Sequence, residues 1–368
     1  MTKSEETPPR GARRLPELPA TMRAAIMKSP LNIEIEEIPV PDVGPDEVLV
    51  KVMAVGVCGS DVHYFEHGRI GPYVVKKPII LGHECAGIVV ACGSEANRFS
   101  PGDRVAIEPG ITCGRCEACK EGRYNLCPEV QFLATPPVDG AFVQYIKHRE
   151  DFLFPIPDHL SFEEAAMNEP FSVGIHALNR AGMKPGWDVA VIGLGPVGLM
   201  AVAAARAFGA RRIFASDLEE NRLRAALQLG ATDIVDGRAG DAAGEIRRLT
   251  EGQGVHVALE TAGHPVALKT ATASLRRGGK LSIVGLPQQA EIGFNVPFLC
   301  DNEIDVYGIF RYANTYPQGI AFLASGAIDV QSLITDRYPL EQTQEAMERA
   351  MRNKAESLKV IVYPNGEA

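Results

Sequence analysis

The sequence lacks an apolar run long enough to span a bilayer, a stripe of Lys and Arg, and a strongly apolar leader. A membrane-spanning helix needs about 20 consecutive apolar residues. The net charge is 37 minus 46, or −9, so neither nucleic acid nor an anionic membrane is an expected partner. Residues 1–21 are rich in Pro, Glu and Arg and have no apolar segment like that of a secretory signal. We therefore expect a cytoplasmic protein with a disordered N-terminal extension and a small-molecule ligand.

No repeat or low-complexity tract divides the chain, but its composition changes near residue 155. A chain of 368 residues is long for one hydrophobic core, which predicts two domains. From Met22 to Phe154, short apolar or alternating segments separated by turn residues predict a β-barrel-type domain. Residues 187–308 alternate strands with helices, one of them over 266–276, and this predicts a doubly wound parallel sheet. The predicted fold class is α/β, and the tail after Phe310 is predicted to return to the first domain.

Eight cysteines are present, and half of them form one short run. This C-x2-C-x2-C-x7-C run consists of Cys113, Cys116, Cys119 and Cys127. Four thiolates this close can surround one tetrahedral Zn²⁺ and leave no open position, which predicts a structural zinc site. An iron-sulfur cluster is the main alternative, although the last gap in ferredoxin-type runs is three residues and here it is seven. Disulfides are a weaker alternative in a chain without a secretory signal.

A second group of metal-binding residue types lies between Val57 and Gly87. Cys58 precedes Asp61 and His63, and the pair His83-Glu84 follows about 20 residues later. Glycines beside these residues let the backbone come close to a bound ion. A buried thiol and a hydrogen-bonded histidine explain the pattern equally well at this point. The remaining cysteines, Cys85, Cys92 and Cys300, are expected to be small core residues.

A glycine-rich turn follows a predicted buried strand that ends at Ile192 and opens an apolar helix. The turn has the pattern G-x-G-x-x-G and consists of Gly193, Gly195, Pro196, Val197 and Gly198, together with the intervening Leu194. The first glycine permits a tight turn, the second lets the backbone approach a pyrophosphate, and the third lets the helix pack against the strand. The helix N-terminus then faces the phosphates. The alternative is an ordinary βα turn that contains glycine.

Asp217 ends the next predicted strand, 19 residues after Gly198. A carboxylate there can accept both ribose hydroxyls and would repel a 2′-phosphate, which favours NAD over NADP. Arg222 lies nearby in sequence and could cover the adenine, pair with Asp217 or help to bind a phosphate. The predicted cofactor is NAD.

Several longer segments resemble the zinc-dependent medium-chain alcohol dehydrogenases, and within them the sorbitol (L-iditol) 2-dehydrogenase and polyol dehydrogenase subgroup. The similarity extends from about Met22 to the C-terminus. The matching segments are Cys58-Gly-Ser-Asp-Val-His-Tyr64, Gly82-His83-Glu84-x-x-Gly87-x5-Gly93, Gly122-Arg-Tyr-Asn125, Ala134-Thr-Pro-Pro137, Asn168-Glu-Pro-Phe-Ser-Val-Gly-Ile-His-Ala177 and Phe310-Arg-Tyr-Ala-Asn-Thr-Tyr316. One departure is the four-cysteine run, which animal sorbitol dehydrogenases lack.

The resemblance implies a fold, an activity and an assembly. It implies a GroES-like catalytic domain made of residues 22–171 and 311–368, a Rossmann domain made of residues 172–310, and a homotetramer. The implied activity is zinc-dependent oxidation of a polyol such as sorbitol or xylitol at C2 to the ketose, with hydride transfer to NAD. Galactitol, L-arabinitol and L-threonine are alternative substrates within the family. An iron-sulfur electron carrier and a non-catalytic dinucleotide-binding protein are the alternatives from other classes.

The resemblance also implies roles for individual residues. The catalytic zinc would be held by Cys58, His83 and Glu84, with Glu169 holding a water molecule on the metal. Asp61 would orient His83, and Ser60 and His63 would relay the alcohol proton. The polyol-binding set would be Tyr64, Glu169, Arg311 and Tyr312. The nicotinamide side would be lined by Val284, Gly285, Leu286, Ile309 and Phe310.

Overall fold

A computed structural model describes residues 18–366 of the chain except 288, 290 and 354. Residues 1–17 of the predicted disordered extension therefore lie outside the described residues. The last residue of that predicted extension, Thr21, already belongs to strand β1 (Thr21–Ser29).

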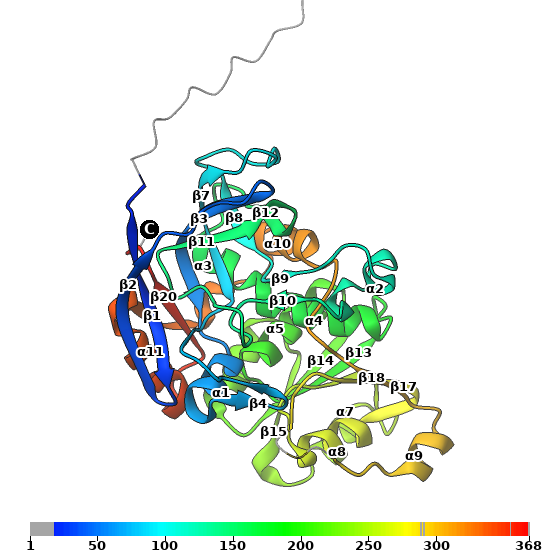
Figure 1. The fold of residues 1–368 in the computed structure, drawn as a ribbon. Coiled ribbons are helices and arrows are strands. Elements are labelled where there is room, and N and C mark those ends of the chain that lie inside the picture. The colour runs from blue at the N-terminus through cyan, green and yellow to red at the C-terminus, as the bar shows by residue number, and fades with distance from the viewer. Residues whose placement is uncertain (1–17, 288, 290, 354, 367–368) are drawn as a thin grey trace, which may run out of the picture.

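The first part of the chain forms a small three-stranded sheet and a larger seven-stranded one (Figure 1). The small sheet has the order β2-β1-β6, and the large sheet has the order β12-β8-β7-β3-β20-β19, with β11 paired to β3. The bounds are β2 Asn32–Pro39, β3 Glu47–Gly56, β6 Ile79–Ile80, β7 Glu84–Cys92, β8 Arg104–Ile107, β11 Tyr145–Arg149, β12 Leu153–Pro155, β19 Ile334–Pro339 and β20 Lys359–Tyr363. Strand β20 pairs antiparallel with β3, so the C-terminal segment completes this sheet. Strand β19 is not indicated by the sequence pattern.

Short elements connect these strands and carry several site residues. The strands are β4 Arg69–Ile70, β5 Tyr73–Val74, β9 Gly110–Ile111 and β10 Gln131–Phe132, and the helices are α1 Gly59–His67, α2 Glu117–Lys120, α3 Phe162–Ala166, α10 Tyr316–Ala324 and α11 Thr343–Arg352. Short 3-10 turns are η1 Tyr124–Leu126, η2 Glu150–Phe152, η4 Gln331–Leu333 and η5 Leu340–Gln342.

The middle of the chain forms a six-stranded parallel sheet with the order β15-β14-β13-β16-β17-β18. In chain order this is 3-2-1-4-5-6, the arrangement of a doubly wound dinucleotide-binding sheet. The strands are β13 Asp188–Ile192, β14 Arg212–Asp217, β15 Asp233–Asp236, β16 Val255–Glu260, β17 Leu275–Ile283 and β18 Asp305–Gly308, and the helices are α5 Pro196–Ala207, α6 Glu220–Gln228, α7 Ala242–Leu249, α8 Pro265–Ala273 and α9 Val296–Asp301, with the 3-10 turn η3 Gly237–Ala239. The predicted doubly wound sheet is confirmed.

The predicted helix over 266–276 is too long at its C-terminal end. Helix α8 ends at Ala273, and β17 begins at Leu275, which pairs with Val255 of β16. Pairing with a neighbouring strand therefore overrides the helical pattern of these last residues.

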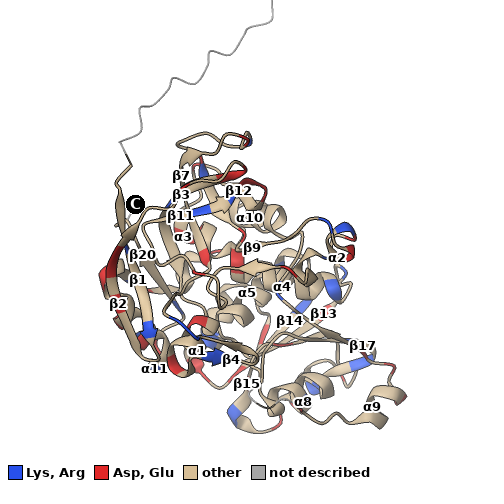
Figure 2. Ribbon diagram, viewed as in Figure 1, with Lys and Arg blue, Asp and Glu red and all other residues tan. Residues whose placement is uncertain are grey.

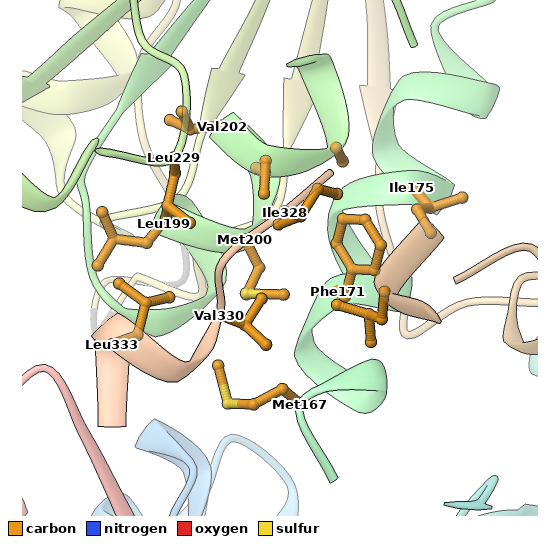
Figure 3. Close-up of a cluster of buried hydrophobic side chains, with 14 of the residues drawn as sticks. Met167, Phe171, Ile175, Leu199, Met200, Val202, Leu229, Ile328, Val330 and Leu333 are labelled. Carbon is orange, nitrogen blue, oxygen red and sulfur yellow. The ribbon is translucent and has the colours of Figure 1, made fainter. Parts of the chain in front are cut away.

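Helix α4 (Asn168–Arg180) joins the two sheets through a large apolar core. Figure 3 shows part of this core, which includes Met167, Phe171 and Ile175 at α4 and Leu199 and Met200 of α5. Val202, Leu229, Ile328, Val330 and Leu333 complete the labelled cluster. Each such side chain contributes about 1.5–3 kcal/mol when it is fully buried. The core fixes α4, which carries Glu169 in its first turn, against the helix of the glycine-rich turn.

The described surface has charges of both signs, and the cysteines outside the four-cysteine run differ in their exposure. In the part of the chain that the structure describes, no helix is long and apolar enough to cross a membrane. Acidic and basic residues are interspersed over its elements (Figure 2). Cys85 is buried and Cys92 is partly buried, but Cys300 is exposed, so the prediction that Cys300 is a core residue is wrong. Helix α9, which carries Cys300, has no buried residue, because it lies on the surface beside the parallel sheet.

Candidate active site and metal centres

Cys58, His83 and Glu84 come together where strands β3 and β7 pair. One donor atom from each lies within 4.8 Å of the others. Gly56 pairs with Glu84, and a Cβ on Gly56 would lie 2.1 Å from Glu84 Oε2, so only glycine leaves room for this carboxylate. Cys58 is the N-cap of α1, and its side chain reaches the same place. A thiolate, an imidazole and a carboxylate are the ligands that zinc prefers in sites with an open position.

Asp61 fixes two of these residues from behind. Its buried carboxylate accepts hydrogen bonds from the backbone N–H groups of Cys58 and Gly82, each at 3.0 Å, and lies 3.5 Å from His83 Nδ1. Burial alone would lower the pKa of His83, but the charges of Asp61 and Cys58 raise that pKa well above its usual value. The contact with Nδ1 leaves Nε2 available to a metal ion.

Glu84 forms a buried ion pair with Lys359, a residue that the sequence analysis missed. Lys359 Nζ donates a hydrogen bond to Glu84 Oε2 and another, at 3.0 Å, to the carbonyl of Val57. The other carboxylate oxygen, Glu84 Oε1, is buried without a hydrogen-bond partner. A buried, unpartnered carboxylate oxygen beside a thiol and an imidazole fits a metal ion. The only sequence signal for Lys359 is a lysine within an otherwise apolar strand.

Glu169 lies in the first turn of α4 and is buried. Its Oε1 accepts a hydrogen bond of 2.8 Å from Tyr312 Oη. Burial raises the pKa of the Glu169 carboxyl to about 7. Among the described residues it lies outside the group formed by Cys58, His83 and Glu84, so its role at the metal stays a prediction.

Helix α1 carries Ser60, His63 and Tyr64 next to Cys58. Ser60 and His63 are three residues apart and therefore lie on the same side of the helix. Tyr64 is buried, and burial raises the pKa of its hydroxyl to about 12. Helix α1 thus places the hydroxyl of Ser60 and the imidazole of His63 on one side, near the candidate zinc ligand Cys58.

Arg311 packs against two aromatic rings. Its guanidinium carbon is 3.9 Å from the centre of the Phe132 ring and 4.7 Å from that of Phe310. Its Nη1 is buried without a hydrogen-bond partner. The sequence analysis missed Phe132, because nothing in the local pattern distinguishes it from a core phenylalanine.

The four thiols of Cys113, Cys116, Cys119 and Cys127 form the second group, with sulfur atoms within 4.8 Å of one another. The N–H of Cys116 donates to Cys113 Sγ and that of Cys113 donates to Cys127 Sγ, both at 3.4 Å. Backbone N–H groups of Arg115 and Cys116 lower the pKa of the Cys113 thiol to about 6. All eight cysteines are free thiols. Four sulfur donors this close to one another fit a closed zinc site.

The lobe around these thiols is hydrogen-bonded to the loop that carries Arg311. Asn125 Nδ2 donates to the carbonyl of Phe310 at 2.8 Å, and Asn314 Nδ2 donates to that of Gly122 at 2.7 Å. Tyr124 Oη accepts from the Asn314 N–H at 2.8 Å and donates to Glu108 Oε1 at 2.7 Å. The lobe therefore holds the loop 310–316 in place.

The three glycines of the glycine-rich turn differ in what a side chain would meet. Gly193 has a φ of +97°, which L side chains rarely adopt. A Cβ on Gly198 would lie 2.0 Å from the carbonyl oxygen of Gly193, whereas nothing lies within 4 Å of a Cβ on Gly195. Pro196 and Val197 open helix α5, whose N-terminus faces this open space. Thr261 Oγ1, which the sequence analysis missed, donates to the carbonyl of Gly193 at 2.5 Å.

Asp217 stands at the end of β14, beside the turn. Its Oδ2 accepts a 2.5 Å hydrogen bond from the N–H of Leu194, and Arg222 Nη1 lies 3.8 Å away. Arg222 thus pairs with the acid in this structure. A carboxylate at this place fits a ribose with two free hydroxyls, which is the ribose of NAD.

The predicted nicotinamide-side residues follow the carboxyl ends of β17 and β18. Val284, Gly285 and Leu286 follow β17, and Ile309 and Phe310 follow β18. The N–H groups of Val284 and Gly285 donate to the carbonyl of Glu260. Leu286 and Phe310 are exposed. Ligands of open parallel sheets bind outside the carboxyl ends of the strands, so these positions suit a dinucleotide.

Comparison with known proteins gives the same family for both halves of the chain. Residues 44–158 match the alcohol dehydrogenase GroES-like domain and residues 196–325 match the zinc-binding dehydrogenase domain. Sorbitol dehydrogenase of Bacillus subtilis (strain 168) is 66% identical over 95% of this chain and 99% of its own length. L-idonate 5-dehydrogenase of Vitis vinifera is 44% identical over 87% of this chain and 89% of its own length.

A solved structure gives the same result. The structure of an Escherichia coli oxidoreductase/dehydrogenase of unknown specificity superposes with a TM-score of 0.88, 41% identity and coverage of 93% of this chain and 99% of that one. With both domains matched and close relatives over nearly its whole length, the chain belongs to the zinc-dependent medium-chain alcohol dehydrogenases.

Proposed function

We propose that this chain is an NAD-dependent polyol 2-dehydrogenase, which oxidises sorbitol, xylitol or a similar polyol at C2 to the ketose. The observation that carries the proposal is the position of Arg311, whose guanidinium packs on two aromatic rings and which lies on the same loop as Tyr312, the partner of Glu169. A monofunctional alcohol offers nothing for such a donor to bind, whereas a polyol offers several hydroxyls. The name of the sorbitol dehydrogenase from Bacillus subtilis supports the same substrate class.

Each group of residues in the candidate site has a proposed role in the reaction. Cys58, His83 and Glu84 would hold the catalytic zinc, which as a Lewis acid lowers the pKa of a bound substrate hydroxyl. Ser60 and His63 on α1 would pass the hydroxyl proton to solvent. Glu169, Tyr64, Arg311 and Tyr312 would orient the polyol. The residues after β17 and β18 would hold the nicotinamide ring so that its C4 faces the carbinol carbon.

The second candidate substrate is a sugar acid. The relative from Vitis vinifera is named L-idonate 5-dehydrogenase, and a guanidinium such as that of Arg311 binds a carboxylate well. Galactitol, L-arabinitol and L-threonine stay alternatives within the family.

Initial rates with NAD over sorbitol, xylitol, galactitol, L-arabinitol, L-idonate and L-threonine test the proposal. We expect kcat/KM for sorbitol or xylitol to exceed that for L-idonate and L-threonine by roughly 10-fold or more. We also expect NAD to be preferred to NADP by roughly 100-fold, because Asp217 would repel a 2′-phosphate. Turnover of L-threonine or L-idonate above every polyol would contradict the proposal.

We further propose a division into domains, a location and an assembly. Residues 22–171 and 311–368 would form the catalytic domain and residues 172–310 the cofactor domain, although α4 runs continuously across residue 171. A cytoplasmic location is supported by the eight free thiols, which persist in a reducing compartment. A homotetramer is supported by β18, which forms an edge of the parallel sheet and exposes Val306. Light scattering of the purified chain measures its oligomeric state.

A further inference from the structure

Arg311 is a partly buried cation that aromatic rings hold in place. It forms no ion pair within the described residues, and its guanidinium lies over the faces of Phe132 and Phe310. Its backbone has a φ of +52°, which is uncommon for a residue with a side chain. The position of this cation therefore rests on the loop backbone and on the two rings, although the charge of Glu169 also acts on it.

The pairing of strands β9 and β10 leaves room for the ring of Phe132. It ends the short strand β10 and pairs with Gly110 of β9. A Cβ on Gly110 would lie 3.1 Å from Phe132 Cδ2, so the glycine leaves the room that the ring occupies. The ring centre is 5.7 Å from that of His83. Phe132 therefore lies close both to a proposed zinc ligand and to the guanidinium of Arg311.

Phe310, the second ring against the guanidinium, is held through its backbone. Its carbonyl accepts the hydrogen bond from Asn125 in the four-cysteine lobe. Its ring position thus depends on the lobe, whereas that of Phe132 depends on the pairing of β9 with β10. Because the two rings are supported independently, they restrict the movement of the guanidinium. Cation–π attraction also favours its contact with both ring faces.

We propose that Phe132 is a positioning residue for substrate: with Phe310 it clamps the Arg311 guanidinium in the orientation in which it binds the polyol. This deepens the proposed function and rests on it for the identity of the substrate. A ring, unlike a carboxylate, restrains the cation without using its hydrogen-bond donors, so these stay available for substrate hydroxyls. The clamp thereby contributes to the preference for substrates with several hydroxyls.

The test is Phe132→Leu, which removes the ring and keeps an apolar side chain. We expect KM for sorbitol to rise about tenfold and KM for NAD to stay unchanged, because Phe132 acts on Arg311 and not on the dinucleotide. Phe132→Tyr keeps the ring face and should restore KM to within about twofold of the wild-type value. In an Arg311→Ala background, Phe132→Leu should have no further effect on KM, because the residue that it positions is gone.

A matched control exists elsewhere in the chain. The guanidinium of Arg104 lies 4.4 Å from the ring centre of Phe162, which is buried like Phe132. Phe162→Leu therefore removes the same kind of contact away from the site and should leave KM for sorbitol unchanged. An equal rise in KM in this control would show that loss of stability, not positioning, causes the effect.

A measurement without substrate separates the clamp from the proposed function. Phenylglyoxal labels accessible arginines, and mass spectrometry of the digested protein follows Arg311 alone. We expect Arg311 to be labelled at least threefold faster in Phe132→Leu than in the wild-type protein. If Phe132→Leu does not fold, Phe132→Met removes the ring with less loss of volume and takes its place.

The outcomes are distinct. Faster labelling in a protein that oxidises no polyol would support the clamp and overturn the proposed substrate. An unchanged labelling rate, or an effect of Phe132→Leu that persists fully in the Arg311→Ala background, would overturn the clamp.

Discussion

At the scale of single residues, the proposed metal site contains two buried pairs of oppositely charged side chains. Asp61 is paired with His83, and Glu84 is paired with Lys359. Breaking a buried pair by removing one partner typically costs about 3–5 kcal/mol, because the remaining charge is left uncompensated. The pair of Glu84 and Lys359 therefore holds one carboxylate oxygen in place while the other stays free for a metal ion.

Glu108 is a buried carboxyl whose only hydrogen-bonded side chain is that of Tyr124, within the described residues. Burial raises the pKa of Glu108 to about 7, above its value in the unfolded chain. The folded state therefore binds this proton more tightly, and the contribution of Glu108 to stability is present below about pH 4.5 and is lost as the pH rises through about 7.

We predict that Glu108→Gln removes this pH dependence and keeps an acceptor for Tyr124. The free energy of unfolding of the wild-type protein, relative to the variant, should fall between pH 5 and pH 8 by up to about 3 kcal/mol, from about 1.4 kcal/mol for each pKa unit. Urea unfolding at pH 5, 6, 7 and 8 measures the difference. Parallel pH profiles for the two proteins would show that Glu108 does not titrate in this range.

The glycine-rich turn shows how one element serves both packing and ligand binding. A Cβ on Gly198 would overlap the carbonyl of Gly193, and this would push α5 away from β13. A Cβ on Gly195 meets no atom of the chain, and the backbone there has a φ of −63°, which alanine adopts readily. The space beside Gly195 is therefore kept for a ligand and not for packing.

We predict that Gly195→Ala and Gly198→Ala separate these two effects. Gly195→Ala should raise the Kd for NAD by about tenfold or more, because the methyl group occupies the pyrophosphate space, and should leave the thermal midpoint within about 2 °C. Gly198→Ala should weaken NAD binding and also destabilise the fold by about 1–3 kcal/mol, because of overpacking. Calorimetric titration and thermal unfolding measure both quantities. Equal destabilisation by the two variants would contradict this assignment.

At the scale of the whole molecule, the proposed open metal site lies where β3 and β7 pair, and the proposed closed site lies in the four-cysteine lobe. The open site is built from residues far apart in sequence, whereas the closed site lies within residues 113–127. The lobe is hydrogen-bonded to the loop 310–316 through Gly122, Tyr124 and Asn125. Loss of the closed site should therefore affect the stability of the lobe and of the loop that it holds.

We predict about two zinc ions per purified chain and no visible absorbance from an iron-sulfur cluster. Cys58→Ser should lose about one zinc ion and reduce turnover by about 100-fold or more, with a thermal midpoint within a few degrees of wild type. Cys116→Ser should also lose about one zinc ion, but with a clearly lower thermal midpoint, because the lobe has little core of its own. Elemental analysis, rates and thermal unfolding of the two variants distinguish the sites. A midpoint as low for Cys58→Ser as for Cys116→Ser would contradict the assignment.

The sequence by itself determined the features that depend on local spacing. The four-cysteine run, the glycine-rich turn with Asp217, and the alternation of strands and helices each lie within one or two neighbouring elements, so the pattern of residues specifies them. The candidate ligands Cys58, His83 and Glu84 could also be named, because they stand in segments that resemble a known family.

Only the tertiary structure decided which distant side chains meet. Lys359 reaches Glu84 across 275 residues of sequence because β20 pairs with β3. Phe132 reaches Arg311 because β10 pairs with β9 beside the loop 310–316. Neither contact follows from hydrophobic periodicity, since a lysine in an apolar strand and a phenylalanine before a turn have ordinary roles in most folds. Such contacts depend on strand pairing over long sequence separations, which is set by the packing of the whole core and not by the residues on either side.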